Sequence, residues 1–147
     1  MKIISKIATT QLISAVFIFL FTYTAVNKLS DIADFRFTLQ QMPFISRSAH
    51  ILAIGLPVLE LLVSALLFFK VSRVAGIYGA LALMSFFTGF IAYMLVTSQS
   101  LPCSCGGVLR HLSWKQHLWF NIFFTVLAMA GLYFERYSQA RGDRRYA

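Results

Sequence analysis

Four long apolar segments are the feature that most constrains the fold of this chain. They cover about residues 7–27, 51–69, 74–96 and 113–134. Crossing a hydrocarbon core of about 30 Å takes about 20 apolar residues of α-helix, and each segment is about that long. Because backbone polar groups find no water in that layer, each segment must satisfy them internally as a helix. The sequence therefore predicts an all-α fold, a four-helix transmembrane bundle that forms one domain over residues 1–135.

The composition of the chain agrees with a bilayer environment. Apolar residues make up 59% of it and charged residues 12%, which is too little charge for an ordinary water-soluble domain. The net charge of +8 arises from basic residues between the apolar segments and at the C-terminus, not along one helix face. We therefore expect the lipid bilayer as a partner, and no nucleic acid.

The distribution of the basic residues predicts how the bundle is oriented. An even number of spans places both termini on one side of the membrane, together with the tight turn at residues 70–73. That side carries eight basic residues: Lys2, Lys6, Lys70, Arg73, Arg136, Arg141, Arg144 and Arg145. The other side carries five: Lys28, Arg36, Arg47, Arg110 and Lys115. The positive-inside rule then predicts a multi-pass membrane protein with cytoplasmic termini and a basic cytoplasmic tail over residues 136–147.

A short amphipathic helix is predicted between spans one and two, over residues 30–43, with Ser30 as its N-cap. Its apolar residues recur at helical spacing: Ile32, Phe35, Leu39 and Met42. We expect this helix to lie in the outer interface, with its apolar stripe either in lipid or over the mouth of the bundle. We interpret it as a connector, and the alternative is a lid.

Three features predict local structure in spans three and four. Span four begins with Ser113-Trp114-Lys115-Gln116, which matches the capping box that fixes a helix start. Asn121, farther along the same span, is interpreted as an interhelical hydrogen-bonding residue. Small residues that let helix backbones approach each other recur along span three: Ala75, Gly79, Ala82 and Gly89.

Glu60 stands in the middle of span two, where an ionised carboxylate facing lipid would cost at least a few kcal/mol. It is therefore expected to face the interior of the bundle, and Pro57 one turn earlier can open the hydrogen-bond ladder of the helix there. Polar side chains near the end of span one offer partners: Tyr23, Thr24, Asn27 and Lys28. Two roles stay open for Glu60, a structural role in helix packing and a role in proton relay or ligand binding.

Cys103 and Cys105, the two cysteines of the chain, lie in a Cys-Ser-Cys-Gly-Gly segment between spans three and four. A disulfide between them would close so small a ring that it stabilises the fold by only about 1.5 kcal/mol. Gly106 and Gly107 permit backbone shapes that other residues disfavour. This CxC motif therefore suits thiol-disulfide exchange better than crosslinking, and the outer side of the membrane is where disulfides persist. We predict Cys103 and Cys105 as the catalytic pair.

A static disulfide and a metal site are the alternatives for this motif. A metal site would need His111 and His117 as further ligands, and the resulting C-x-C-x5-H-x5-H spacing does not match the zinc motifs. We interpret each of these histidines as facing solvent or headgroups, so no metal is expected.

Several of these residues together resemble one family. They are Asn27-Lys28-Leu29 at the end of span one, Leu56-Pro57-x-x-Glu60-Leu61 in span two, Cys103-x-Cys105-Gly106-Gly107 before span four, and Trp114 and Asn121 within it. Over about residues 17–131 the chain resembles the methylamine utilisation protein MauE family, within the wider DoxX-like membrane proteins. The resemblance implies a four-helix integral membrane protein that supports the maturation of a disulfide-rich exported enzyme, alongside a thioredoxin-like partner.

The primary functional hypothesis is an integral membrane thiol-disulfide redox protein that supports the maturation or redox supply of an exported partner such as a thioredoxin-like protein. As an enzyme it would be a thiol-disulfide oxidoreductase that needs no cofactor. One alternative is an oxidoreductase coupled to a membrane quinone, and another is an accessory or scaffold subunit without enzymatic activity. Residues expected to support the cysteine pair are Lys28, Pro57, Glu60, Gly106 and Asn121.

Overall fold

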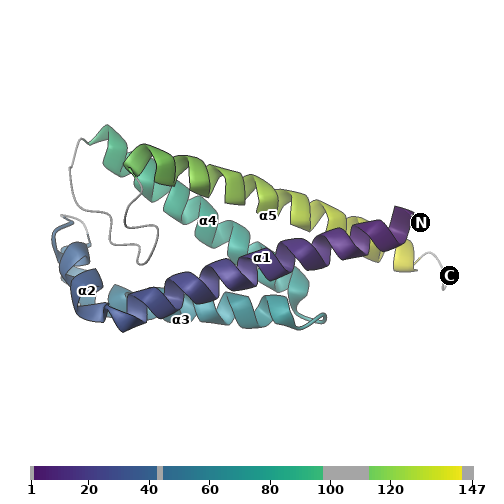
Figure 1. The fold of residues 1–147 in the computed structure, drawn as a ribbon, viewed down its shortest axis with the longest axis horizontal. Coiled ribbons are helices and arrows are strands. Elements are labelled where there is room, and N and C mark those ends of the chain that lie inside the picture. Colours follow the sequence, from purple (N-terminus) through teal and green to yellow (C-terminus); the bar gives the residue numbers. More distant parts are fainter. Residues whose placement is uncertain (1, 43–44, 98–112, 144–147) are drawn as a thin grey trace.

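The computed structural model describes residues 2–42, 45–97 and 113–143, which form five α-helices (Figure 1). Four of them are long: α1 (Lys2–Ser30), α3 (Ala49–Phe68), α4 (Arg73–Val96) and α5 (Trp114–Asp143). The short helix α2 (Ile32–Gln40) and a single 3-10 turn at Ser46–Ser48 lie between α1 and α3. The described residues contain no strand. The predicted all-α fold, with four long helices and a short one between the first two, is confirmed.

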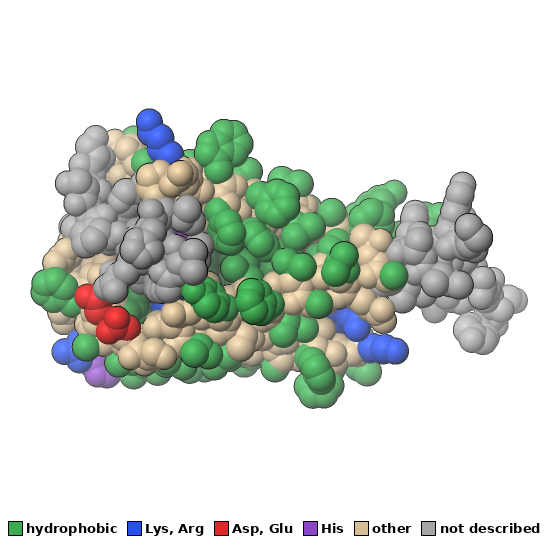
Figure 2. All heavy atoms as spheres, in the orientation of Figure 1, with side chains coloured by type: hydrophobic (Ala, Val, Ile, Leu, Met, Phe, Trp, Pro, Cys, Tyr) green, Lys and Arg blue, Asp and Glu red, His purple; other side chains and the backbone are tan. Residues whose placement is uncertain are grey.

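Each long helix contains a stretch that is long and apolar enough to cross a membrane. Many large apolar side chains in these stretches face outward, as Phe19, Ile51 and Phe123 do with exposed fractions of 72%, 74% and 62%. Figure 2 shows hydrophobic side chains over the middle of the bundle and charged side chains toward its ends. A continuous apolar surface of this extent marks contact with lipid. The protein is therefore a multi-pass membrane protein.

The long helices form two antiparallel pairs. α1 packs chiefly against α3 and α4 chiefly against α5, while smaller contacts join α1 to α5 and α3 to α4. The start of α1, the α3–α4 turn and the last turns of α5 lie at one end of the bundle (Figure 1). The opposite end, called the α2 end below, contains α2, the end of α4 and the start of α5.

The centre of the bundle is an apolar core to which all four long helices contribute. Phe17 and Phe21 of α1 are each 1% exposed, and their stacked rings have centroids 5.8 Å apart. Phe124 of α5 meets Phe17 edge to face, with centroids 5.6 Å apart. Aromatic pairs of this kind contribute about 0.5–1.5 kcal/mol beyond their burial. Aromatic packing between these rings therefore holds α1 against α5 without a charged contact.

α3 and α4 approach each other closely at two glycines of α4. A Cβ on Gly76 would lie 2.7 Å from the backbone nitrogen of Leu67, and one on Gly79 would lie 2.9 Å from Cγ2 of Val63. The small-residue packing predicted for span three is thus observed at Gly79, with Gly76 beside it, whereas Ala75 and Ala82 are exposed and do not take part. Its extension to Gly89 is wrong, because a Cβ there would meet no described atom within 4 Å.

The start of α5 confirms the predicted capping box. The Ser113 amide donates to Gln116 Oε1 at 2.9 Å, and the Gln116 amide donates to Ser113 Oγ at 3.3 Å. The Ser30 cap predicted for the short helix is wrong, because α1 continues through Ser30 and Asp31 is the N-cap residue of α2. Both α1 and α5 are longer than the predicted spans, since hydropathy detects the stretch in lipid while helical hydrogen bonds continue into the polar flanks.

The short helix α2 covers the mouth of the bundle. Its residues Phe35, Thr38 and Leu39 are buried, and the apolar ones join Met42 and the start of α3 in a second apolar cluster. Phe37, on the other face of α2, is 59% exposed. The apolar stripe of α2 therefore lies over the mouth of the bundle and not in lipid, which is one of the two positions expected from the sequence.

Candidate functional site

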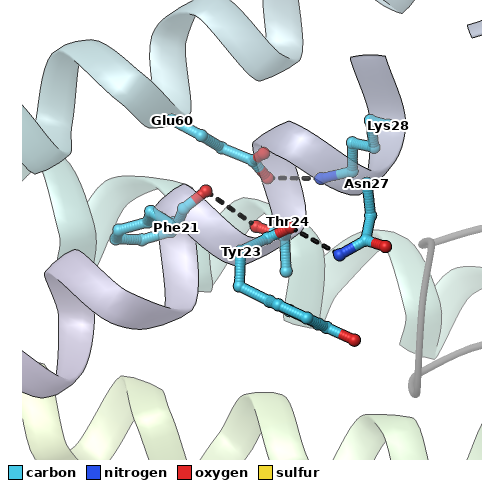
Figure 3. A network of polar contacts seen from close by, with 6 residues as sticks. All are labelled: Phe21, Tyr23, Thr24, Asn27, Lys28 and Glu60. Atoms are coloured by element: carbon cyan, nitrogen blue, oxygen red, sulfur yellow. Dashed lines mark hydrogen bonds and ion pairs between the residues drawn. The ribbon is translucent and has the colours of Figure 1, made fainter. Parts of the chain in front are cut away.

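Lys28 and Glu60 form an ion pair inside the bundle, near the α2 end (Figure 3). Lys28 Nζ donates to Glu60 Oε1, and the two residues are 5% and 1% exposed. Solvent hardly screens a pair at this depth, so the loss of one partner would leave an uncompensated buried charge. Glu60 thus faces the interior of the bundle, and its partner is Lys28.

Lys28 is one of the partners expected for Glu60, and the structure selects it. Although it was also counted with the basic residues of the outer side, its side chain is buried. α1 continues to Ser30, and Phe35 of α2 lies over the Lys28 ammonium, so the side chain is enclosed. Lys28 also belongs to the last turn of α1, where the helix dipole favours a cation.

Pro57 lies one turn before Glu60 and is itself fully buried. α3 passes through this proline as an uninterrupted helix. Because proline has no N–H, the carbonyl of Ala53 lacks the helical donor that any other residue would supply. Pro57 therefore weakens the backbone ladder of α3 just before the ion pair.

Two aromatic rings flank the Lys28 ammonium. Its Nζ lies 5.3 Å from the ring centroid of Phe87 on α4 and 5.8 Å from that of Phe35 on α2. A cation over a ring face is stabilised by roughly 0.5–2 kcal/mol, more when it is desolvated. The ammonium is thus held by one carboxylate oxygen and by two ring faces from different helices.

The second carboxylate oxygen, Glu60 Oε2, is in a different situation. It is buried, and no donor among the described residues forms a hydrogen bond with it. The neighbouring Thr24 hydroxyl donates to the Phe21 carbonyl oxygen, 3.2 Å away (Figure 3). Asn27 Nδ2 likewise bonds its own helix, at the Tyr23 carbonyl oxygen 2.7 Å away.

A cavity of about 120 Å³ lies beside the ion pair. All five helices contribute to its wall, which is mostly apolar. Its aromatic side chains include Phe21, Phe35, Phe87, Phe90 and Phe120. The polar side chains in the wall are Thr24, Lys28, Thr38, Glu60, His117 and Asn121. An apolar cavity with a few convergent polar groups is the usual form of a small-molecule site.

His117 and Asn121 bring polar groups of α5 to the cavity wall, with exposed fractions of 4% and 3%. The expectation that His117 faces solvent or headgroups is wrong, because the packing of α5 against the other helices turns this side chain inward. Asn121 Nδ2 donates to the His117 carbonyl oxygen, 3.0 Å away. This donor therefore bonds within α5 and not between helices as predicted.

The predicted exchange pair, Cys103 and Cys105, lies outside the described residues, as do Gly106, Gly107 and His111. Within the described ranges, no three His, Cys, Asp or Glu side chains come together in a group that could hold a metal ion. The ion pair and the cavity wall are therefore the part of the candidate site that the geometry defines.

The range of a family match covers both parts of this site. A family model described as methylamine utilisation protein MauE matches residues 4–134. The chain belongs to the MauE family. The resemblance expected from the sequence is confirmed, and the matched range of this MauE-family protein contains the ion pair, the cavity wall and the cysteine segment. No curated protein and no solved structure shows a significant match to the chain.

Several wall residues of this MauE-family protein are not singled out by its sequence. Phe35 fits the amphipathic pattern of α2, which is a usable signal. Phe87 carries no such signal, since a phenylalanine that faces a cavity and one that faces lipid look alike in an apolar helix. Phe86 and Phe87 illustrate this, because they are adjacent and both line the cavity, yet only Phe87 packs over the Lys28 ammonium, while Phe86 is 59% exposed.

Proposed function

We propose that this protein is a thiol-disulfide redox protein of the bacterial inner membrane that supports the maturation or redox supply of an exported thioredoxin-like partner. Cys103 and Cys105 are the exchanging pair. When reduced, their two thiols pass two electrons and two protons to a disulfide of the partner and become a disulfide themselves. The reverse exchange reduces the pair and oxidises the partner.

The observation that carries the proposal is where the cysteine segment joins the bundle. α4 ends at Val96, and the Thr97 amide closes its last turn by donating to the Tyr93 carbonyl oxygen at 3.0 Å. α5 starts at the Ser113 cap, and both helix ends lie at the α2 end (Figure 1). Chain continuity therefore attaches the two cysteines to the end of the bundle that holds the cavity and the ion pair.

The burial of Lys28 strengthens the charge asymmetry that supports an outer position for this end. Without it, four basic residues belong to the cysteine side, against eight on the side of the termini. By the positive-inside rule the termini then face the cytoplasm and the α2 end faces outward. Disulfides persist on that side of a bacterial membrane, so the orientation fits the proposed chemistry.

Cysteine variants test the proposal in cells. Cys103→Ser and Cys105→Ser each leave one thiol, so both are expected to stop the exchange and one to accumulate a mixed disulfide with the thioredoxin-like partner on non-reducing gels. Ser104→Ala keeps both thiols and serves as the matched control. If the partner keeps its normal oxidation state in both cysteine variants, the proposal is refuted.

The side of the membrane is tested separately. A membrane-impermeant thiol reagent applied to intact cells is expected to label Cys103 and Cys105 after reduction but not in the oxidised protein. Labelling that requires permeabilised cells would place the thiols in the cytoplasm and contradict the proposed orientation.

A quinone-coupled oxidoreductase is a second candidate, which one observation favours. The cavity combines aromatic walls with a buried cation and a buried carboxylate inside the bilayer. In this function the thiols of Cys103 and Cys105 pass two electrons and two protons to a quinone, which yields a disulfide and a hydroquinone. If purified protein shows no turnover at saturating quinone, this candidate is ruled out.

A scaffold role is the third candidate. It would be favoured if partner binding survives the change of both cysteines to serine.

A further inference from the structure

The side-chain carboxamide of Asn121 has unused hydrogen-bonding groups at the cavity wall. Asn121 is 3% exposed, and its Nδ2 donates to the His117 carbonyl oxygen on its own helix. A carboxamide has two N–H donors and one oxygen that accepts. Neither the second N–H nor the side-chain oxygen of Asn121 forms a hydrogen bond with a described residue. Buried polar groups usually have partners, so this carboxamide suits a ligand in the cavity.

The Lys28 ammonium brings further donors to the same wall. An ammonium has three N–H bonds, and the hydrogen bond described for this one goes to Glu60 Oε1. The rings of Phe35 and Phe87, which flank the ammonium, contain no oxygen or nitrogen that could accept the other two. Lys28 lines the cavity from α1, and Asn121 lines it from α5. The wall therefore offers hydrogen bonds from two helices.

The cavity has room for one six-membered ring. Its volume is about 120 Å³, and an engineered apolar protein cavity of about 150 Å³ binds benzene. Phe87 and Phe120 in its wall offer faces and edges to a ring. Size and lining therefore indicate a single ring, and the two polar groups indicate a ring that carries oxygen.

The cavity also has a wall residue in contact with lipid. Phe86 lines the cavity and is 59% exposed on the outer surface of α4. Because α4 crosses the membrane at this residue, a molecule dissolved in the bilayer meets the cavity wall there. The ligand is thus expected to be lipid-soluble.

We propose that the cavity holds the ring of a membrane quinone, bonded through its oxygens to Lys28 Nζ and the Asn121 carboxamide, in the oxidised and the reduced state alike. The oxidised ring has only acceptors, to which the ammonium and Asn121 Nδ2 donate. The reduced ring has hydroxyls, which accept from the ammonium and donate to Asn121 Oδ1. A carboxamide with a free donor and a free acceptor therefore serves both states. Glu60 is a positioning residue that holds the ammonium and does not contact the ring.

This inference deepens the second candidate function and rests on it for its biological meaning, but the binding it describes does not involve the cysteines. Three probes with the same tail separate the contributions: decylquinone, decylhydroquinone and decylbenzene. The first carries only acceptors, the second carries donors and acceptors, and the third carries neither. All three offer a six-membered ring to the cavity.

Calorimetric titration of the full-length protein in quinone-free lipid nanodiscs, under argon, measures the three affinities. A hydrogen bond from a charged donor corresponds to roughly a ten- to hundredfold gain in affinity. We expect decylquinone and decylhydroquinone each to bind at least tenfold more tightly than decylbenzene. A smaller gain for either of them, or no binding of any probe, overturns the assignment.

Asn121→Leu tests the contact with the carboxamide. It keeps the size of the side chain, and it should reduce the preference for both oxygen-bearing probes over decylbenzene by roughly two- to tenfold, the value of a neutral hydrogen bond. Asn27→Leu is the matched control, because Asn27 Nδ2 likewise bonds its own helix, at the Tyr23 carbonyl oxygen, and Asn27 is not a wall residue. If Asn121→Leu changes the preference no more than Asn27→Leu does, the carboxamide is not a contact of the ring.

The contact with the ammonium is tested by removing both charges of the ion pair together, so that neither stays buried alone. Lys28→Met/Glu60→Leu is expected to reduce the preference for the oxygen-bearing probes at least tenfold while decylbenzene binds as in the wild type. An unchanged preference in this variant contradicts the role of Lys28.

A last comparison separates this inference from the thiol chemistry. The Cys103→Ser/Cys105→Ser variant is expected to bind decylquinone as tightly as the wild type, because the cavity wall is intact. Loss of binding in this variant contradicts the proposed site. If the wild type binds the probes but shows no thiol exchange, only the redox function is contradicted.

Discussion

A double-mutant cycle on the buried ion pair gives the sharpest test of how this bundle is held together. Lys28 and Glu60 are 5% and 1% exposed, so neither charge can be solvated if the other is removed. Breaking a buried pair of this kind costs about 3–5 kcal/mol of unfolding free energy. We therefore expect Lys28→Met and Glu60→Leu each to lower the stability of the protein by about that amount.

The double variant is expected to behave differently from the sum of the two. Replacing both charges by apolar side chains of similar volume is often neutral or stabilising, so Lys28→Met/Glu60→Leu should unfold within about 1 kcal/mol of the wild type or above it. The interaction energy between the two sites is then at least about 5 kcal/mol, which is above the range of about 0.5–3 kcal/mol found for most contacting residues.

Reversible unfolding in mixed micelles of dodecylmaltoside and dodecyl sulfate, followed by far-ultraviolet circular dichroism, measures these differences. Lys70→Met, at an exposed lysine in the turn between α3 and α4, is the matched control and should change the stability by no more than about 0.5 kcal/mol. Single variants that each cost less than about 1 kcal/mol, with additive effects in the double variant, would refute the reasoning.

Two further predictions concern helix packing and helix starts. In the same micelle assay, Gly76→Ala places a Cβ 2.7 Å from the Leu67 backbone and should destabilise the bundle by about 1–3 kcal/mol. Gly89→Ala is the control, because its Cβ meets no described atom, and it should be neutral or stabilising by up to about 1 kcal/mol. Ser113→Ala removes the cap of α5 and should cost about 1 kcal/mol. Ser48→Ala, at an N-cap that makes no side-chain capping bond, should cost less, and equal losses would contradict the capping assignment.

The helices could be predicted because each apolar segment leaves its backbone no alternative in lipid. Their ends were less predictable, because hydropathy carries no information on where helical hydrogen bonding stops. The capping box at Ser113 is an exception, since a local sequence pattern specifies that start and the structure contains both of its hydrogen bonds. Ser30 shows the opposite case, in which a plausible cap is absorbed into the preceding helix.

The candidate site was partly predictable for a similar reason. Glu60 is conspicuous because a carboxylate in an apolar span must face inward. Four polar residues of α1 were equally suitable as its partner, and the choice of Lys28 depends on how α2 folds over the end of α1. His117 and Phe87 depend on the rotation of α5 and α4, which is a property of the packed bundle and not of local sequence. Tertiary packing thus decides the wall of the cavity.

The location of the ion pair also bears on the two roles that the sequence leaves open for Glu60. The core around Phe17 and Phe124 shows that this bundle packs its helices well without charge. A buried pair that leaves Oε2 without a described donor is a costly way to achieve packing alone, because an apolar pair would serve as well. The pair also lines the cavity of about 120 Å³, which favours the ligand-binding role. The stable double variant therefore separates the two roles: if Lys28→Met/Glu60→Leu folds normally but no longer supports the exchange between the cysteine pair and its partner, the charges serve the function, whereas unchanged exchange would leave them with packing only.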